Sequence, residues 1–443
     1  MSTESYLLNL IFEIRMSTFH ARKYTPLFDH NRHMSISNIY IDHHATTPLD
    51  PRVLDAMMPY LTNRFGNAAS RDHMFGWQAE EAVELARAQV AELIGADKKE
   101  ILFTSGATES NNLALKGAAE AYAAKGNHII INAAEHRSVL DVCKHLAIQG
   151  YEITSLPVSR VGTVDPEEVR KAVTPRTILI SVMMANNEIG CVNPLKEIGV
   201  IAREKNILFH SDIAQAAGKI AVDVNELNMD MASVSGHKIY GPKGVGALFV
   251  RQKGPRVKLI AQMDGGGHEK GMRSGTLNVP GIVGLGKAAE LCRLDFNKNF
   301  LHYVELRNKL YETLVTNLDG CHLNGPGIEK LEKLKDPLSI YEASKSIKRL
   351  PNNLNVSFDH TKAGSIMVAA KEIAMSSGSA CTSALPEPSH VLRAIGVDDE
   401  RAKASLRFGV GRFNTAEEID YAGKRLIEVI SMLRKNSAHA STI

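Results

Sequence analysis

The sequence has few cysteines, and none of them stands in a CxxC pair. A scattered, odd-numbered set argues against a disulfide framework and against a zinc site. Most such thiols are small buried hydrophobes in intracellular proteins, and we expect that fate for all but the last of the five. The five are Cys143, Cys191, Cys292, Cys321 and Cys381.

Long apolar runs and a strong charge bias are also missing. No stretch of 18 or more apolar residues is present, which excludes a spanning helix and predicts no membrane partner. Lys and Arg number 52 against 49 Asp and Glu, a net charge of +3, and they form no dense basic run, so we expect no direct contact with nucleic acid. The 443 residues are 44% hydrophobic and 23% charged, which is typical of a globular protein of two or three domains.

Residues 1–37 differ from the rest of the chain. A short apolar stretch, Tyr6–Ile14, follows Glu4 rather than a basic start and precedes no small-residue cleavage site, so a secretory signal is not predicted. A mitochondrial presequence would be atypical because acidic residues are present, and Met16 and Met34 permit a later translation start. We predict a poorly ordered extension.

From Tyr40 onward, strand patterns alternate with helical periods. Apolar residues within Gln78–Ile94 share one face, which predicts a helix that packs on a sheet and is stopped by Gly95. The alternation predicts an α/β fold with a mostly parallel sheet that is covered on both faces. The strands are expected at Ile101–Thr104, His128–Asn132, Thr177–Met184 and Ile207–Asp212.

Near residue 295 the pattern changes to longer helical segments, Tyr303–Leu318 and Ala416–Leu433, and one strand, Asn353–Phe358. We predict a large domain of residues 52–296 and a smaller α+β domain of residues 38–51 and 297–443. A Lys/Glu-rich stretch at about 325–350 is interpreted as a solvated surface insertion.

The first candidate for chemistry is Lys238, within Ser235-Gly236-His237-Lys238. A lysine between a strand end and a Gly/Pro-rich turn is held at a defined point and can form a Schiff base with an aldehyde cofactor. By itself it would more often be an ordinary surface lysine.

A second segment, Thr104–Glu109, breaks at Gly106 where a helix is expected to begin. The exposed amides and hydroxyls at such a helix start suit a phosphate group. The alternative is that Ser105 or Thr108 merely caps the helix.

Two more residues stand out. Asp212, at the end of an apolar strand, suits pairing with a protonated pyridine nitrogen; the alternative is an exposed strand-end carboxylate that caps the next helix. Cys381 lies in a run of small residues, Ser376–Ala384, which cannot build a core and favours a mobile loop with an accessible thiol.

Together these segments closely resemble the NifS/IscS-type cysteine desulfurases, a pyridoxal-phosphate family of aminotransferase class V. The resemblance covers about Asn38 to about Leu433 and rests on five motifs, with SSGSACTS in the form of the housekeeping group. They are TSGATESNNLALKG, NNEIG, SGHKIYGPKGVGAL, GGGHEKGMRSGT and SSGSACTSA.

The resemblance implies an aminotransferase-type (fold type I) homodimer that uses pyridoxal 5'-phosphate. It implies catalytic roles for Lys238, which forms the Schiff base, for His136, which stacks on the cofactor and assists proton transfer, and for Cys381, the nucleophile. Asn187 and Arg407 would bind the substrate, and Thr276 would reach the phosphate of the other subunit's cofactor. The cofactor-binding residues are Ala107, Thr108, His136, Asp212, Gln215, Ser235, His237, Lys238 and Thr276.

The implied reaction converts L-cysteine to L-alanine and leaves a persulfide on Cys381. The sulfur would then pass to an iron–sulfur scaffold or another acceptor protein, with tRNA thiolation as a further use. No resident metal is implied, although Cys381 could contribute a ligand to a cluster during transfer. The expected compartment is the cytoplasm, with a mitochondrion or an organelle derived from one as the alternative.

Two departures from the family pattern concern the acceptor. The chain ends soon after Leu433 without the longer tail that docks the scaffold in many relatives, and His360–Ile366 replaces an acidic Glu-Gly-Glu-like run. We therefore expect an altered small-domain surface.

The alternative functions are a selenocysteine lyase or another β-eliminating enzyme on the same scaffold, and a non-catalytic descendant of the fold.

Overall fold

The computed structural model describes residues 38–329, 331, 336–377 and 388–440. The described residues group into one compact unit. The predictions for residues 1–37 and for Cys381 lie outside the described residues. No helix in the described part of the chain is long and apolar enough to cross a membrane.

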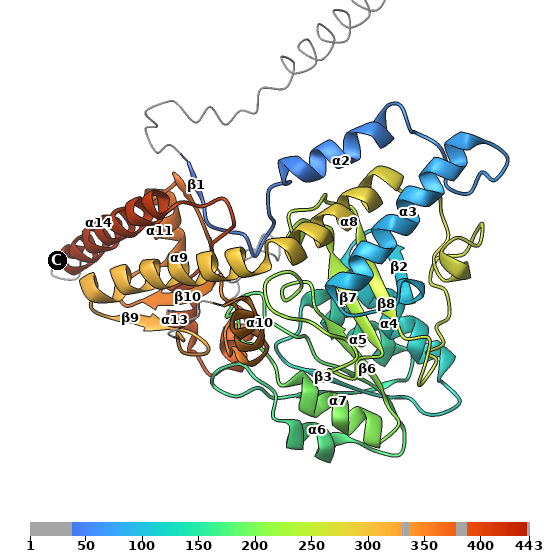
Figure 1. The fold of residues 1–443 in the computed structure, drawn as a ribbon. Helices are drawn as coiled ribbons and strands as arrows, with labels where there is room; N and C mark the ends of the chain where they lie inside the picture. Colours follow the sequence, from blue (N-terminus) through green and yellow to red (C-terminus); the bar gives the residue numbers. More distant parts are fainter. Residues whose placement is uncertain (1–37, 330, 332–335, 378–387, 441–443) are drawn as a thin grey trace, which may run out of the picture. The chain divides into compact units, whose positions relative to one another are not determined.

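A mostly parallel sheet of seven strands forms the centre of the larger half (Figure 1). Its strands are β2 (Ile101–Thr104), β3 (His128–Asn132), β4 (Glu152–Leu156), β5 (Thr177–Ser181), β6 (Leu208–Asp212), β7 (Met231–Ser235) and β8 (Gly246–Val250). Their order is β2-β8-β7-β6-β5-β3-β4, and β8 is antiparallel to both of its neighbours. The α/β class predicted from the sequence is confirmed.

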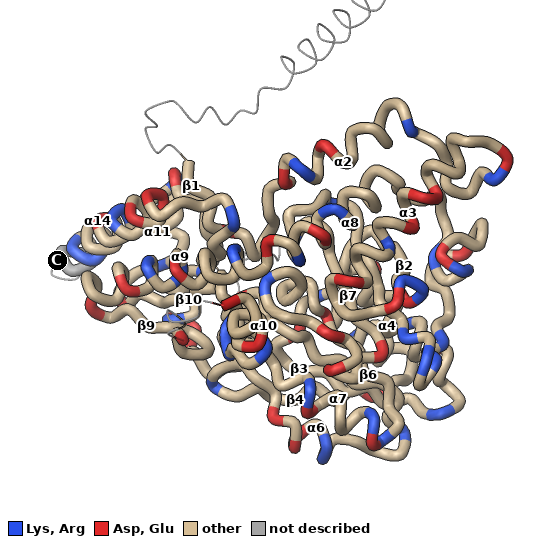
Figure 2. The backbone as a smooth tube through the Cα atoms, in the orientation of Figure 1, with Lys and Arg blue, Asp and Glu red and all other residues tan. Residues whose placement is uncertain are grey.

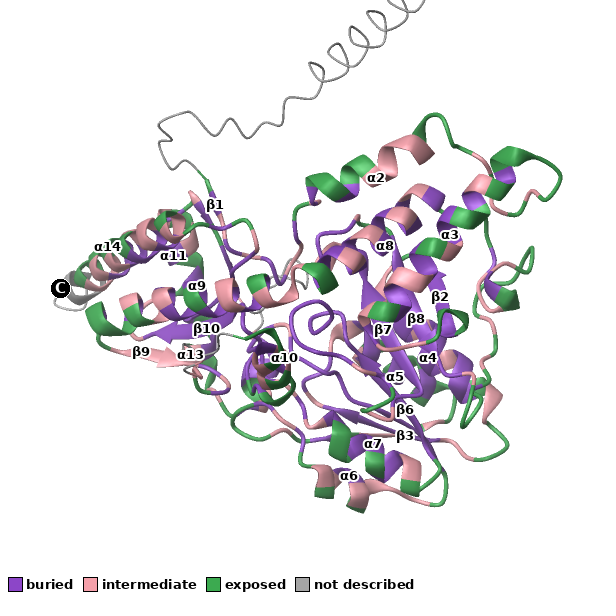
Figure 3. Cartoon of the chain, viewed as in Figure 1, coloured by how far each residue is buried: buried purple, intermediate pink, exposed green. Residues whose placement is uncertain are grey.

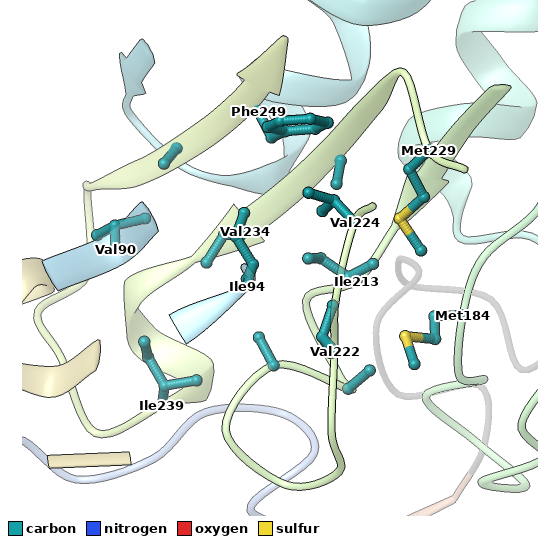
Figure 4. Close-up of a cluster of buried hydrophobic side chains, with 14 of the residues drawn as sticks. Val90, Ile94, Met184, Ile213, Val222, Val224, Met229, Val234, Ile239 and Phe249 are labelled. Carbon is teal, nitrogen blue, oxygen red and sulfur yellow. The ribbon is translucent and has the colours of Figure 1, made fainter. Parts of the chain in front are cut away.

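Helices cover both faces of this sheet, because alternate strand residues enter two separate cores. Phe249 packs in a cluster with Ile94 (Figure 4), to which Phe103 also belongs, whereas Leu102 and Leu248 pack on the opposite face with Leu113. Strands β6, β7 and β8 are buried along their length (Figure 3). Burial of both faces is typical of parallel sheets. The helices of this half are α2 (Pro51–Leu61), α3 (Met74–Leu93), α4 (Ala107–Ala121), α5 (Arg137–Ile148), α6 (Pro166–Ala172), α7 (Leu195–Glu204) and α8 (Val279–Leu294).

Local boundaries differ from the expectations at several elements, and two of them show the physical reason. Helix α3 begins four residues earlier than predicted because the His73 ring accepts a hydrogen bond from the Gly76 amide, and it stops before Gly95, whose φ is +70°. Strand β5 ends at Ser181, three residues early. The amides of Val182 and Met184 still bond to carbonyl oxygens of β6, so the chain leaves the sheet gradually.

The candidate segments gather at one edge of the sheet. Each follows the carboxyl end of a strand: residues 105–108 follow β2, residues 134–136 follow β3, residues 212–215 close β6, and residues 235–238 close β7. In open α/β sheets, ligands bind beyond this edge. The topology alone therefore brings together residues that are over 100 positions apart.

The smaller half contains an antiparallel sheet in the order β12-β13-β10-β9 and a parallel pair formed by β1 (Ile39–Tyr40) and β11 (Ile373–Ala374). Helices α9 (Phe296–Asn317) and α14 (Ala416–Ala440) pack together beside it (Figure 1). The domain borders predicted at 51/52 and 296/297 stay predictions. The remaining elements are β9 (Cys321–Leu323), β10 (Asn353–Phe358), β12 (Ser376–Ser377), β13 (Ser405–Gly409), α10 (Pro337–Ser346), α11 (Ala363–Ala369), α12 (His390–Ala394), α13 (Asp399–Lys403) and the 3-10 turns η1 (Lys98–Glu100), η2 (Gly236–Lys238) and η3 (Glu269–Gly271).

The stretch at 325–350 is not only a solvated insertion, and that prediction is wrong for its second half. Ile340 of α10 and Leu350 are buried in the core that covers the large sheet, and Arg349 is fully buried. The charged residues that suggested a surface segment occupy the outer side, where Lys345 pairs with Glu226. Elsewhere in the described chain, acidic and basic residues are interspersed (Figure 2).

Candidate active site

Lys238 lies in η2, the single 3-10 turn that follows β7. Its Nζ donates hydrogen bonds to the carbonyl oxygens of His44 and Ala45, at 2.5 and 2.7 Å. The Thr47 amide and hydroxyl both bond to the carbonyl oxygen of His237. Residues 42–47, which precede α2, are therefore attached to the lysine turn and form one side of the site.

Asp212 is buried and its two oxygens are bound by neutral donors. Oδ1 accepts the Ala214 amide at 3.0 Å, and Oδ2 accepts Asn111 Nδ2 at 2.8 Å. The alternative of an exposed carboxylate that caps the next helix is wrong, because Asp212 is buried and is followed by turns and not by a helix. The contact with Asn111 joins the carboxylate to α4, so its position is determined by tertiary structure.

His136 is the N-cap of α5, and its Nδ1 accepts hydrogen bonds from Ser138. The Ser138 amide lies 3.2 Å from Nδ1 and the hydroxyl 2.8 Å away, while Asn111 Nδ2 donates to the same hydroxyl oxygen. Nδ1 is thus an acceptor, and the hydrogen of the neutral ring resides on Nε2. Burial lowers the pKa of His136, although Asp212 acts in the opposite direction.

The start of α4 provides an anion site. The N-cap is Gly106, with φ of +151° and no side chain to cap the helix, so the capping alternative for Ser105 or Thr108 is wrong. A Cβ on Gly106 would lie 3.9 Å from Ser235 Oγ, which places that hydroxyl beside the helix start. Amides at the start of a helix favour a bound anion.

His237 lies next to Lys238, and its Nδ1 is 3.1 Å from Thr46 Oγ1. Burial and the neighbouring Lys238 ammonium lower the pKa of His237 to about 4. The ring is therefore neutral at physiological pH. It can offer a hydrogen bond without adding a charge.

Gln215 is held by His44. Gln215 Oε1 lies 3.0 Å from His44 Nδ1, and Gln215 Nε2 donates to the His44 carbonyl oxygen at 3.0 Å. Burial, with Arg407 and two lysines nearby, keeps the pKa of His44 well below its usual value. Sequence reasoning missed His44, although the His-His pair directly before Ala-Thr-Thr was a visible signal.

Arg407 lies on β13, opposite Ser376 and Asn355 in the neighbouring strands. Its side chain is 2% exposed, and it donates to Asp42 Oδ1 at 2.9 Å and to the Asn187 carbonyl oxygen at 3.1 Å. Asn187 therefore meets Arg407 through its backbone. Asp42, which also accepts the Ser376 hydroxyl, was not predicted.

One predicted site residue, Thr276, is not brought to this place in the described part of the chain. Thr276 is exposed on the segment that precedes α8, and no contact joins it to the other site residues described here. Cys381 lies outside the described residues. The roles of both residues stay predictions.

The residues present fit pyridoxal phosphate. Two buried polar atoms here have no partner among the described residues, namely Asn111 Oδ1 and Arg407 Nε. Such atoms are rare unless a further group satisfies them. An amine, a buried carboxylate and an anion site match the aldehyde, ring nitrogen and phosphate of that cofactor. No group of three metal-ligating side chains occurs in the described ranges.

An α/β fold with a lysine, an aspartate and an anion site at the carboxyl edge of its sheet defines a class of pyridoxal-phosphate enzymes. The family model for class-V aminotransferases matches residues 39–422, and the chain belongs to this family. The family and fold predicted from the sequence are confirmed.

Individual relatives are more specific than the family model. The chain is 55% identical over 399 residues to the cysteine desulfurase IscS of Anaeromyxobacter dehalogenans, which covers 90% of this chain and 94% of the relative. It is 53% identical over 396 residues to the cysteine desulfurase IscS of Rickettsia bellii, with coverages of 89% and 92%.

Solved structures agree with these relatives. A NifS-like protein matches with a TM-score of 0.78 at 36% identity, over 89% of this chain and all of the other. SspA in complex with cysteine matches with a TM-score of 0.71 at 34% identity, over 85% of this chain and all of the other.

Proposed function

We propose that the protein is a pyridoxal-phosphate-dependent cysteine desulfurase, which converts L-cysteine to L-alanine and carries the removed sulfur as a persulfide on Cys381. The observation that carries the proposal is the meeting of Lys238, Asp212 and Arg407 in one site of a chain 55% identical to an IscS enzyme. These residues bind an aldehyde, a pyridine nitrogen and a carboxylate.

The cofactor residues have separable tasks. Lys238 would bind the aldehyde carbon, Asp212 the ring nitrogen and Gln215 the phenolic oxygen. The amides of Ala107 and Thr108, with Ser235 and His237, would hold the phosphate. When bound, the cofactor supplies an electron sink for the bond changes at the substrate Cα and Cβ.

Arg407 binds the substrate carboxylate. A guanidinium offers planar, paired N–H groups that match a carboxylate. Its Nε has no partner among the described residues, so at least one donor is available. Asn187 contacts Arg407 at its carbonyl oxygen and helps to orient it.

Sulfur transfer balances without an external oxidant. The Cys381 thiolate attacks the substrate sulfur, an S–S bond forms and the Cβ–S bond breaks. The electron pair of the broken bond stays on carbon, which takes up a proton to give the methyl group of alanine. His136, with its hydrogen on Nε2, can supply and retake a proton at the site.

A homodimer is part of the proposal. Large apolar side chains are exposed on α2, on α3 and between them, and clusters of this kind mark interaction surfaces. A second copy on this surface would bury them and bring Thr276 toward the partner's phosphate site. We expect Phe65→Glu to shift the sedimentation of the protein toward monomer, and an unchanged dimer would reject this surface. The exposed residues are Leu54, Leu61, Phe65, Met74, Phe75 and Trp77.

The sulfur acceptor is proposed from the relatives, which are named IscS. We propose an iron–sulfur scaffold protein as the first acceptor and the cytoplasm as the compartment. Pull-down with the full chain, scored for persulfide on the captured protein, tests the acceptor. Tagged protein in the organelle fraction would contradict the compartment.

The decisive experiment replaces Cys381 with Ala and uses Cys321→Ala as the matched control. Burial raises the pKa of the Cys321 thiol to about 11, so its loss should not affect transfer. We expect Cys381→Ala to keep the yellow cofactor spectrum and to lose protein-bound persulfide, while Cys321→Ala keeps both. Alanine formation at the wild-type rate in Cys381→Ala would refute the role of Cys381 as the nucleophile, whereas formation of pyruvate and ammonia would indicate β-elimination.

A further inference from the structure

A chain of buried hydrogen bonds runs from the smaller half of the protein to Gln215. It begins at Arg349, whose Nη1 donates to Asn353 Oδ1 at 2.8 Å. A guanidinium can only donate, so this contact fixes the orientation of the Asn353 amide. Asn353 Nδ2 then donates to the carbonyl oxygen of Glu188 at 3.0 Å and to His44 Nε2 at 3.2 Å.

The same logic determines the state of His44. Because its Nε2 accepts from Asn353, the ring hydrogen of neutral His44 must lie on Nδ1, which donates to Gln215 Oε1 at 3.0 Å. One hydrogen of Gln215 Nε2 binds the His44 carbonyl oxygen. The other has no partner among the described residues. Every member of the chain is buried: Arg349, Asn353 and His44 are at most 1% exposed, and Gln215 is 5% exposed.

We propose that His44 is a positioning residue for the cofactor, the middle member of a one-way hydrogen-bond relay from Arg349 through Asn353 to Gln215. The inference rests on the proposed function, in which Gln215 binds the phenolic oxygen. His44 holds both ends of the Gln215 amide, so that the second N–H of Nε2 stays available. A rotated amide would present its oxygen to the cofactor oxygen instead, which is repulsive.

A purely structural role for His44 makes different predictions. A buried histidine that only fills space would affect stability but not the charge state of a bound ligand. An N–H that donates to the phenolic oxygen stabilises its negative form, so loss of that bond disfavours release of the proton. The relay therefore has a spectroscopic signature: the midpoint pH at which the visible band of the cofactor-loaded protein shifts.

The first measurement is a pH titration of that band. We expect His44→Ala to raise the midpoint by about 0.5 to 1 pH unit, the equivalent of one neutral hydrogen bond. Asn at position 44 can place an N–H near the position of Nδ1, whereas Gln places its amide near Nε2. His44→Asn should therefore keep the wild-type midpoint and His44→Gln should not.

Three control variants test the relay separately from the proposed role of Gln215 at the phenolic oxygen. Gln215→Ala should raise the midpoint by itself, and His44→Ala should add nothing in that background. His43→Ala removes a neighbouring buried ring that bonds to Gly409 instead, and it should leave the midpoint unchanged. An unchanged midpoint in Gln215→Ala would refute the role of Gln215 in the proposed function. A shift in Gln215→Ala together with none in His44→Ala would refute the relay alone.

A second measurement needs no cofactor. Nitrogen NMR of labelled histidines in the cofactor-free protein should show neutral His44 with its hydrogen on Nδ1 through the physiological pH range. A hydrogen on Nε2 would overturn the relay, since Asn353 could then not donate to it. If His44→Ala does not fold, the tautomer and the contrast between His44→Asn and His44→Gln still decide the proposal.

Discussion

The two ends of the active site are built on different electrostatic principles. At the large sheet, Asp212 is held by a backbone amide and by Asn111, both of which are neutral. At the small sheet, Arg407 meets the carboxylate of Asp42. Neutral anchors leave the charge of Asp212 available to a ligand, whereas the charge of Arg407 is already shared with a carboxylate of the protein.

Buried cations on the small-sheet side are expensive to desolvate. Arg349 is accommodated by carbonyl oxygens of Pro326, Ile189 and Asn324, and burial lowers its pKa to about 9. This arrangement joins three separate segments of chain. The small-sheet end therefore depends on buried guanidinium groups whose hydrogen-bond partners must stay in place, and the cofactor end depends on one reactive amine.

The largest expected effect belongs to the cofactor end. Lys238→Ala removes the amine that binds the aldehyde, and we expect kcat to fall about 10³-fold or more, with loss of the covalent cofactor spectrum. Lys243→Ala, in the next turn along the chain and exposed, is the matched control and should keep both. A coloured, reducible cofactor adduct that survives in Lys238→Ala would place the covalent link on another lysine.

The next effect concerns Glu188, which lies between the two ends and accepts a hydrogen bond from Ser389. Burial raises the pKa of Glu188 to about 7, despite the Ser389 bond and the charges of Arg407 and Arg137. Between about pH 4.5 and pH 7 the folded state thus binds more protons at this site than the unfolded state. The contribution of Glu188 to the free energy of unfolding therefore falls as pH rises through this window, and it is constant above it.

Glu188→Gln removes that dependence. We expect the variant to gain about 3 kcal/mol on wild type between pH 5 and pH 8, as an order of magnitude, measured by urea unfolding. Glu342→Gln, on the exposed side of α10, should follow wild type at both pH values. If the free energy of unfolding depends on pH in the same way in wild type and in Glu188→Gln, Glu188 is ionised throughout this pH range.

The contrast between the two ends of the active site also explains which site residues could be predicted from the sequence. Lys238, Asp212 and the residues around Gly106 follow the ends of apolar strands, and parallel topology brings strand ends together, so their proximity was predictable. Asp42 and His44 could not be found in this way, because their segment follows the two-residue strand β1 and reaches the site only through contacts with residues over 160 positions away. Arg349 was misplaced because a Lys/Glu-rich neighbourhood hides a buried cation.

Arg407 is the next residue to test, at the small-sheet end. Arg407→Lys keeps a positive charge but loses the planar pair of donors. We expect kcat/KM for cysteine to fall about 30-fold, near 2 kcal/mol, mainly through KM. Arg401→Lys, which alters a guanidinium bound to Ser357 and Asn324, should leave KM within about twofold. An unchanged KM in Arg407→Lys would move the carboxylate site elsewhere.

The smallest expected effect, at Asp42, tests the contrast between the two ends of the active site most directly. Asp42 both neutralises Arg407 and holds it, and two substitutions separate these tasks. Asn at position 42 can still accept from Arg407 and bond to Ser376, so Asp42→Asn removes only the charge. We expect it to lower KM for cysteine about two- to fivefold, because the guanidinium then attracts the substrate carboxylate without competition.

Asp42→Ala removes the positioning contact as well, and we expect it to raise KM, since Arg407 loses its partner and can take other rotamers. KM for cysteine is measured for both variants by steady-state kinetics at constant ionic strength, because the effects of charges near solvent depend on salt. A lower KM in Asp42→Asn together with a higher KM in Asp42→Ala would establish that Asp42 occupies the place of a substrate carboxylate. Equal increases in KM would mean that Asp42 acts only as a support, and the small-sheet end would then resemble the cofactor end.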